Sequence, residues 1–166
     1  VYDVRKAEDE CVLESSFTTG KHSDAVWELV WLNKGPERGE ALVSVSADGR
    51  VTQWTMSKGL EYSDLIKLKR VASHKKAGGG AGTAAHNKKE AFISRMASGM
   101  CADFNSKDAS LYVVGTEEGN VHKCSVSYNE QYLETYMGHS GPVYKVAWSP
   151  FVSSAFLSCS ADWTIR

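Results

Sequence analysis

The 166-residue chain lacks closely spaced cysteines and long hydrophobic segments. Its four cysteines are far apart, with no CxxC pair, and they are Cys11, Cys101, Cys124 and Cys159. Metal sites and disulfide frameworks need clustered cysteines, so we expect reduced, buried thiols in an intracellular protein. No apolar run approaches the ~18 residues of a membrane span, and no signal peptide is visible. We therefore predict no bound metal and no contact with a membrane.

The chain also lacks an excess of charge of one sign. Its formal net charge is −1, which argues against nonspecific binding of nucleic acid, and we predict none. The charge is unevenly distributed, because residues 67–95 contain eight basic side chains and a single acid, Glu90. This segment carries +7 and the rest of the chain −8. Residues 73–90 are rich in Lys, Gly and Ala, a composition that buries too little apolar surface to order itself, and we predict a flexible basic insertion over residues 73–95.

What the sequence does contain is an internal repeat. Residues 41–48 (ALVSVSAD) align with residues 155–162 (AFLSCSAD), with five of the eight positions identical. Upstream of each block, residues 21–31 align with residues 138–148 and share His, Ser, Val and Trp in register. A degenerate third copy at residues 111–121 keeps the apolar run and the turn Gly. Because two blocks recur in the same order, the chain consists of repeated structural units.

Each unit is predicted to be a set of short strands. Apolar segments rich in Val, Leu and aromatic side chains are joined by acid–Gly pairs, and no convincing helical periodicity is present. The pairs Asp48-Gly49 and Glu118-Gly119 predict tight hairpins, since Gly tolerates the positive φ that such turns require. Glu118 and Asp162, which occupy equivalent positions, are 44 residues apart. This spacing is typical of β-propeller blades, which have about 40–45 residues.

The units resemble WD repeats. The resemblance is carried by Lys21-His22 and Gly138-His139 at the start of two units and by residues 46–54 and 160–166 at their ends. It implies an all-β WD-repeat β-propeller of seven or eight blades, of which about three and a half are present. Residues 1–5 are predicted as a strand. The predicted parts are the end of one blade (1–20), a blade (21–72), the insertion (73–95), a degenerate blade (96–137) and a truncated blade (138–166).

In WD repeats, a loop His, a strand Ser or Thr, a turn Asp and a strand Trp form a hydrogen-bonded tetrad. By resemblance, the first tetrad consists of His22, Ser44, Asp48 and Trp54. The second consists of His139, Ser158 and Asp162, with its Trp beyond Arg166. We expect the Asp carboxylate to accept from imidazole and hydroxyl, and the Trp to supply one N–H. The degenerate blade has other residues at these positions (Val114, Glu118 and Cys124), so we expect packing alone to hold it.

A Ser, a His and an Asp thus occur together twice, as in a catalytic triad. A set repeated at equivalent positions is typical of architecture rather than of a single active site. The Gly-rich residues 78–83 lack the Gly-Lys-Ser/Thr ending and the strand–helix frame of a phosphate-binding loop. We therefore predict no catalytic residue, no cofactor and no enzymatic activity.

A narrower resemblance rests on residues 114–119 (VGTEEG), 123–125 (KCS) and 158–164 (SCSADWT). With these motifs the chain is similar to the WD-repeat intermediate chains of axonemal dynein, of the outer arm. The resemblance implies a noncatalytic scaffold for microtubule-based motility, located in the cytoplasm and in the cytoskeleton of a ciliary or flagellar axoneme. The implied partners are the tail of a dynein heavy chain, a second intermediate chain and, through a region outside this chain, dynein light chains.

Three large side chains are candidates for binding a partner. Trp27 and Tyr144 each follow a loop His by five residues, and Met100 occupies the matching position of the degenerate copy. Aromatic residues at the end face of a propeller are frequent hot spots of binding, although ordinary packing is the alternative. The alternative function is a generic adaptor such as a ubiquitin-ligase substrate receptor, because residues 2–5 (YDVR) resemble the Trp-Asp-x-Arg box of such receptors.

Overall fold

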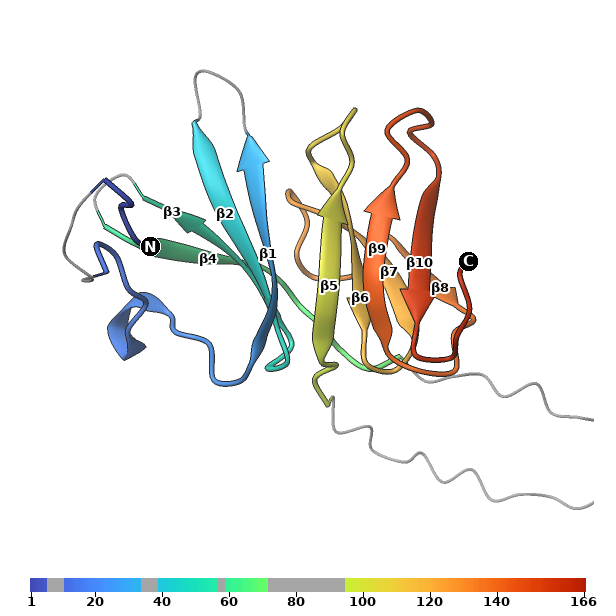
Figure 1. The fold of residues 1–166 in the computed structure, drawn as a ribbon. Coiled ribbons are helices and arrows are strands. Elements are labelled where there is room, and N and C mark those ends of the chain that lie inside the picture. The colour runs from blue at the N-terminus through green and yellow to red at the C-terminus, as the bar shows by residue number, and fades with distance from the viewer. Residues whose placement is uncertain (6–10, 34–38, 57–58, 72–94) are drawn as a thin grey trace, which may run out of the picture.

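The computed structural model describes residues 1–5, 11–33, 39–56, 59–71 and 95–166. Within these ranges the chain forms ten strands and one 3-10 helix (Figure 1). In chain order the elements are η1 (Phe17–Thr19), β1 (Val26–Asn33), β2 (Glu40–Ser46), β3 (Arg50–Thr55), β4 (Glu61–Lys67), β5 (Gly99–Phe104), β6 (Leu111–Thr116), β7 (Asn120–Ser125), β8 (Glu134–Met137), β9 (Val143–Trp148) and β10 (Phe156–Ser160). The predicted all-β fold is confirmed.

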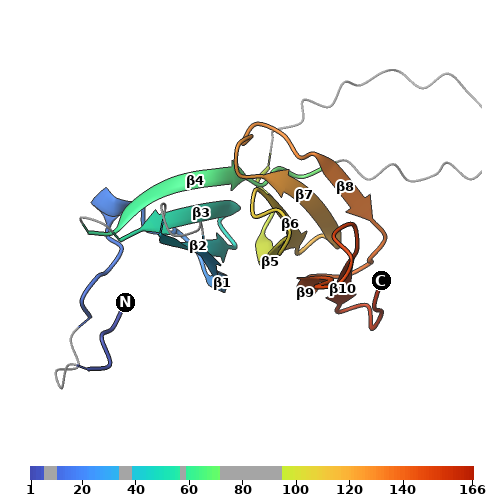
Figure 2. The ribbon, with the colours of Figure 1, turned by 90° about the horizontal axis from the view of Figure 1, so that it is seen from above.

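The strands form three antiparallel sheets in which each strand pairs with its neighbour in sequence. The first sheet contains β1–β4, the second contains β5–β8, and the third contains β9 and β10. Figure 2 shows the sheets fanned like successive blades, with β1, β5 and β9 on the inner side and β4 and β8 on the outer side. The described residues therefore contain two complete four-stranded blades and half of a third. This is fewer than the three and a half blades predicted, because residues 1–5 and 11–20 contribute no strand to a sheet.

Residues 1–5 form no strand, so the strand predicted for them is wrong. A strand must pair its backbone N–H and C=O groups with a neighbouring strand, and residues 1–5 pair with none of the described strands. Its backbone instead pairs locally: the amide of Val12 donates to the carbonyl of Val1 at 2.8 Å. The terminal ammonium group of Val1 donates to the carbonyl of Leu13 at 2.6 Å.

The hairpin turns lie where the sequence predicts them. Gly49 joins β2 to β3 with φ +82°, and Gly119 joins β6 to β7 with φ +86°. The amide of each glycine closes its turn, with a hydrogen bond of 3.1 Å to the carbonyl of Ser46 and one of 3.2 Å to the carbonyl of Thr116. The prediction that these glycines adopt positive φ in tight turns is confirmed.

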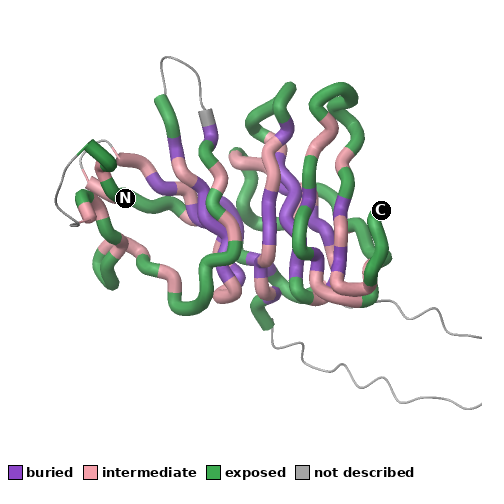
Figure 3. Tube along the Cα trace, viewed as in Figure 1, coloured by how far each residue is buried: buried purple, intermediate pink, exposed green. Residues whose placement is uncertain are grey.

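Apolar side chains fill the space between successive sheets rather than a single central core. Between the first and second sheets, buried side chains include Val43, Val45 and Tyr112. Between the second and third sheets they include Val113 and Val143. Figure 3 shows that buried residues follow the middle strands of the sheets, whereas the loops at both ends are exposed. Each sheet is therefore stabilised mainly by the face that it presents to the next one.

A short antiparallel pairing of residues 69–70 with residues 95–96, which we call the neck, joins the first sheet to the second. Lys69 and Met96 form an isolated antiparallel bridge, and the amide of Arg70 donates to the carbonyl of Arg95 at 3.0 Å. The chain therefore leaves the first sheet and enters the second at adjacent points. The basic insertion predicted at residues 73–95 lies, except for its last residue, outside the described residues.

Candidate functional site

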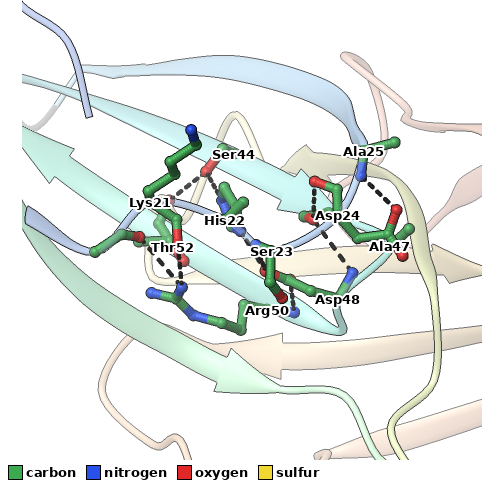
Figure 4. Close-up of polar contacts among 12 residues, drawn as sticks. Lys21, His22, Ser23, Asp24, Ala25, Ser44, Ala47, Asp48, Arg50 and Thr52 are labelled. Atoms are coloured by element: carbon green, nitrogen blue, oxygen red, sulfur yellow. Dashed lines mark hydrogen bonds and ion pairs between the residues drawn. The ribbon is translucent and has the colours of Figure 1, made fainter. Parts of the chain in front are cut away.

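The structure brings the four residues of the first predicted tetrad together. The indole Nε1 of Trp54 donates to Ser44 Oγ at 2.7 Å, and Ser44 Oγ lies 2.7 Å from Nε2 of His22. On the other side of the ring, His22 Nδ1 lies 2.9 Å from Oδ2 of Asp48 (Figure 4). A carboxylate only accepts, so Nδ1 carries the proton and Nε2 accepts from the hydroxyl. The three hydrogen bonds therefore form a continuous chain from the indole on β3 to the carboxylate in the turn between β2 and β3.

This series differs in one respect from the prediction. The carboxylate of Asp48 was expected to accept from both the imidazole and the Ser hydroxyl, and this part of the prediction is wrong. The ring of His22 lies between Asp48 and Ser44 and bridges them. The imidazole can do so because its two nitrogens point in opposite directions, one to donate and the other to accept.

Asp48 also holds the backbone around it. Its carboxylate accepts from the amide of Ser23 at 3.1 Å and from the amide of Arg50 at 2.9 Å. Burial alone raises the pKa of Asp48, but these amides and His22 favour the charged form and hold the pKa below its ordinary value. One carboxylate therefore fixes both the loop that enters β1 and the turn that enters β3.

The third sheet repeats this arrangement with the residues predicted for the second tetrad. His139 Nδ1 lies 3.0 Å from Asp162 Oδ2, and His139 Nε2 lies 2.9 Å from Ser158 Oγ. The amide of Ser140 donates to Asp162 at 3.0 Å, as that of Ser23 does to Asp48. Burial opposes ionisation of Asp162, but hydrogen bonds, chiefly from Thr164 and Ser140, keep its pKa below the ordinary value.

The second sheet replaces this set with apolar packing along β6 and β7. Val114 and Cys124, which stand in place of Ser and Trp, are both fully buried. The register pairs Cys124 with Tyr112, whereas the first sheet pairs Trp54 with Leu42. The large side chain has thus moved from the third strand of the sheet to the second, where Tyr112 fills the interior. Burial raises the pKa of the Cys124 thiol to about 12, so it stays protonated.

Packing alone does not hold the second sheet, so that expectation is wrong. The imidazole of His122 on β7 is buried and stacks on the ring of Tyr132, with centroids 3.7 Å apart and an interplanar angle of 8°. Its Nδ1 lies 3.0 Å from the hydroxyl oxygen of Thr135 on β8. Burial lowers the pKa of His122 to about 4, so the ring is neutral at physiological pH. Sequence reasoning missed this cluster because no WD-repeat motif marks it.

The three predicted partner-binding residues lie at β-bulges. The register of each inner strand skips one residue, which is Trp27 in β1, Met100 in β5 and Tyr144 in β9. A bulged residue has no cross-strand partner, and its side chain is re-aimed relative to the regular alternation. Trp27 is 57% exposed and Tyr144 58%, whereas Met100 is only partly exposed.

All three bulges lie at one end of the molecule, the lower end in Figure 1, where β1, β5 and β9 begin and the β2–β3 and β6–β7 turns lie. We call this the end face. An ion pair reaches across it: Nζ of Lys145, which follows Tyr144, lies 3.0 Å from both carboxylate oxygens of Glu28, which follows Trp27. The first and third sheets therefore contact each other directly, past β5.

Two kinds of feature are absent from the described part of the chain. Its residues bring together no group of His, Cys, Asp and Glu side chains that could hold a metal ion. Within the same ranges, no helix has the length and apolar character needed to cross a membrane.

The fanned antiparallel sheets, with a His–Asp pair repeated in their loops, define a WD-repeat β-propeller segment. Residues 130–166 match the family described as "WD domain, G-beta repeat". Among solved structures, the WD40 β-propeller domain of Doa1 aligns with a TM-score of 0.60 at 18% sequence identity, over 89% of this chain and 38% of that one. The prediction of a partial WD-repeat propeller is confirmed.

A closer similarity identifies the kind of propeller. The chain is 54% identical to dynein axonemal intermediate chain 4 of Xenopus laevis, over 100% of this chain and 23% of that protein. It is 51% identical to the human protein of the same name, over 99% of this chain and 20% of that protein. Its identity to dynein axonemal intermediate chain 1 of Bos taurus is 36%, over 100% of this chain and 22% of that protein.

The chain is thus a WD-repeat segment related over its whole length to the axonemal dynein intermediate chains, as the sequence motifs predicted. It spans 20–23% of the length of these three relatives. Their names carry the word axonemal, in agreement with the location predicted for the chain, the cytoskeleton of a ciliary or flagellar axoneme. The names do not distinguish the dynein arms, so the outer arm stays a prediction.

Proposed function

We propose that this chain belongs to a noncatalytic scaffold subunit of an axonemal dynein motor complex, and that its end face binds the tail of a dynein heavy chain. The observation that carries the proposal is the similarity, at 54% identity over the whole chain, to a protein named as a dynein axonemal intermediate chain. On the same basis, we propose that its neighbours in the complex are a second intermediate chain and dynein light chains. The light chains are proposed to bind another part of the protein.

The environment of the Ser, His and Asp residues supports a role without catalysis. Ser44 is only 2% exposed, and its oxygen already accepts from the indole of Trp54. A serine nucleophile must reach a substrate carbonyl, which this hydroxyl cannot do. The same arrangement of His and Asp recurs in the third sheet. We therefore assign these residues a structural role, which is to fasten the loop before the innermost strand to its own sheet.

The end face is the proposed interface because it carries exposed aromatic side chains on a rigid support. Trp27 and Tyr144 are each the second residue of an inner strand, and the residues that follow them, Glu28 and Lys145, form an ion pair. Large aromatic groups bury a wide area and lose little rotamer entropy on binding, and for this reason they dominate many interfaces. Met100 lies on β5, between the strands that carry the two aromatic residues, and adds an adaptable apolar contact.

The test is a pull-down of a recombinant axonemal heavy-chain tail by the complete protein. The double variant Trp27→Ala, Tyr144→Ala is expected to lose binding, since truncating one hot spot typically removes ~2 kcal/mol or more. Its melting temperature is expected to stay within a few degrees of the wild type. A matched control is Phe151→Ala, which removes a ring that is 89% exposed in the β9–β10 loop, at the opposite end.

Two outcomes would contradict the proposed interface. If the double variant binds as well as the wild type, the contact lies on another surface. If its melting temperature collapses, the two aromatic residues belong to the packed interior of the complete protein. Failure of the wild type itself to bind any axonemal heavy-chain tail would count against the proposed function as a whole.

A further inference from the structure

Basic side chains gather at the neck. In the sequence, residues 67–95 contain eight basic side chains and a single acid. The pairing of residues 69–70 with residues 95–96 brings the two ends of this segment together. Four of its basic residues are described by the structure and all four are exposed, namely Lys67, Lys69, Arg70 and Arg95. The neck therefore concentrates positive charge from both ends of a long stretch of sequence.

The neck lies between two complete sheets. The first and second sheets each contain four strands, and buried side chains such as Val43 and Tyr112 pack between them. Figure 2 shows that the neck leaves the end of β4, the outermost strand of the first sheet, on the outer side of the molecule. Successive sheets pack face to face, so an additional sheet would stack beyond the first or the third and would leave the outer side of the neck exposed.

The backbone beside the basic residues is fixed on both sides. The amide of Leu68 donates to the carbonyl of Gly49 at 2.7 Å, and the amide of Ala97 donates to the carbonyl of Leu68 at 2.9 Å. The side chains of Leu68 and Ala97 are fully buried. Because alternate residues of an extended chain point to opposite sides, the burial of Leu68 turns Lys67 and Lys69 outward together.

A groove of about 460 Å³ opens beside these two lysines. The end of β4 and the neck form one wall, which carries Lys67 and Lys69. The opposite wall is the connection between β7 and β8, with Asn129, Glu130 and Gln131. The side-chain amides of Asn129 and Gln131 can each donate two hydrogen bonds. The groove therefore combines two ammonium groups and two amide donors with the carboxylate of Glu130.

Two other acids near the neck already have partners. Nη2 of Arg50 donates to Oδ1 of Asp64, which also lines the groove, at 2.8 Å, and Nε of Arg50 donates to the same oxygen at 3.1 Å. Nε of Arg70 lies 2.5 Å from Oε1 of Glu118. Each carboxylate is thus neutralised by an arginine.

The lysines of the groove keep an excess of positive charge. Nζ of Lys67 lies 4.0 Å from Oδ2 of Asp64, whose charge Arg50 already balances. Among the described residues, Lys69 has no acidic partner, and neither does Arg95 on the paired strand of the neck. Glu130 is a single carboxylate for these cations, so the surface of the neck is electropositive.

We propose that this groove binds an acidic segment of a protein partner. Carboxylates accept hydrogen bonds from ammonium groups and from side-chain amides, which are the donors that the groove presents. Single-stranded nucleic acid fits less well, because its binding sites add aromatic side chains on which bases stack, and none lines the groove. The charge of −8 on the rest of the chain also opposes a long polyanion. The proposal involves none of the residues of the end face.

The test measures binding of a fluorescein-labelled oligoglutamate peptide to the complete protein by fluorescence anisotropy. The variant Lys67→Gln, Lys69→Gln is expected to bind the peptide roughly tenfold more weakly than the wild type at low salt, where exposed ion pairs are least screened. Lys67→Arg, Lys69→Arg keeps both charges and is expected to retain binding. A matched control is Lys21→Gln, Lys107→Gln, which removes two exposed charges elsewhere and should bind like the wild type.

Four results would overturn the proposal. One is a wild type that does not bind oligoglutamate, or that binds an oligoglutamine peptide equally well. Another is an equal loss in the control variant, which would mean that the attraction is not specific to the groove. A third is full binding by Lys67→Gln, Lys69→Gln, which would place the site elsewhere. The last is tighter binding of oligothymidylate than of oligoglutamate, which would replace the protein partner with a nucleic acid. The heavy-chain pull-down uses other residues, so its outcome is independent of these.

Discussion

The phenol oxygen of Tyr132 makes two hydrogen bonds to the backbone of Lys69, 63 residues earlier in the chain. It accepts from the amide of Lys69 at 2.6 Å and donates to its carbonyl at 2.9 Å. The same ring stacks on the buried imidazole of His122. Tyr132 therefore connects the interior of the second sheet to the neck that precedes this sheet.

Replacing Tyr132 by Phe should lower the free energy of unfolding by about 1–2 kcal/mol, because both backbone groups of Lys69 lose their partner while the stacking is kept. Urea unfolding of the complete protein would measure this loss. Tyr128→Phe, in the β7–β8 connection, is a suitable control, since the ring of Tyr128 is 41% exposed. An equal effect of the two substitutions would mean that the bonds to Lys69 contribute nothing to stability.

Replacing Asp48 by Ala should lower the free energy of unfolding by roughly 1–3 kcal/mol. The substitution leaves Nδ1 of His22 and the amides of Ser23 and Arg50 without an acceptor. Glu118→Ala in the second sheet should cost less, because the carboxylate of Glu118 pairs with Arg70, whose side chain is half exposed. Thermal melts of both variants would decide the matter, and equal losses would contradict the structural role of Asp48.

The stability of the protein should fall as the pH decreases from about 6.5 to about 4 through the protonation of His122. Burial lowers the pKa of His122 to about 4 in the folded state, whereas an unfolded histidine has a pKa of about 6.5. Between these values the unfolded chain binds the proton and the folded chain does not, so acid favours unfolding. The pKa difference corresponds to roughly 3 kcal/mol, and above pH 6.5 this contribution is constant.

The measurement is urea unfolding at several pH values, for the wild type and for His122→Gln. The variant keeps a polar side chain but cannot titrate, so its stability should depend less on pH in this window. Both proteins contain His22 and His139, and their difference therefore isolates His122. Identical pH profiles would show that the imidazole of His122 is not kept neutral by burial.

Much of this fold could be predicted because a repeated structural unit leaves a repeated pattern of residues in the sequence. The two similar blocks around His22 and His139 predicted equivalent loops, and the structure gives both imidazoles the same pair of neighbours. Gly49 and Gly119 predicted turns with positive φ because few other residues adopt it readily. These are local properties of the chain, and one or two residues are enough to specify each.

The remainder depends on relations between strands that composition does not encode. The bulges at Trp27 and Tyr144 arise from a register skip that no residue type requires. In the second sheet the large side chain is Tyr112 on β6 and the small one is Cys124 on β7, the reverse of the first sheet. This reversal can be recognised only when the register of β6 and β7 is known. Trp163 adopts the conformation of glycine because of its place in the turn, against the preference of its side chain.

The neck also fixes how the first two sheets are placed relative to each other, whatever number of residues lies between 71 and 95. Lys69 and Met96 are paired, so the ends of whatever chain lies between residues 71 and 95 are already together. Closing a loop whose ends meet costs only about 0.6 kcal/mol more for each doubling of its length. Insertions and deletions at this point should accumulate between related proteins with little effect on the register of either sheet. Length here can therefore diverge while the blades on both sides stay alike.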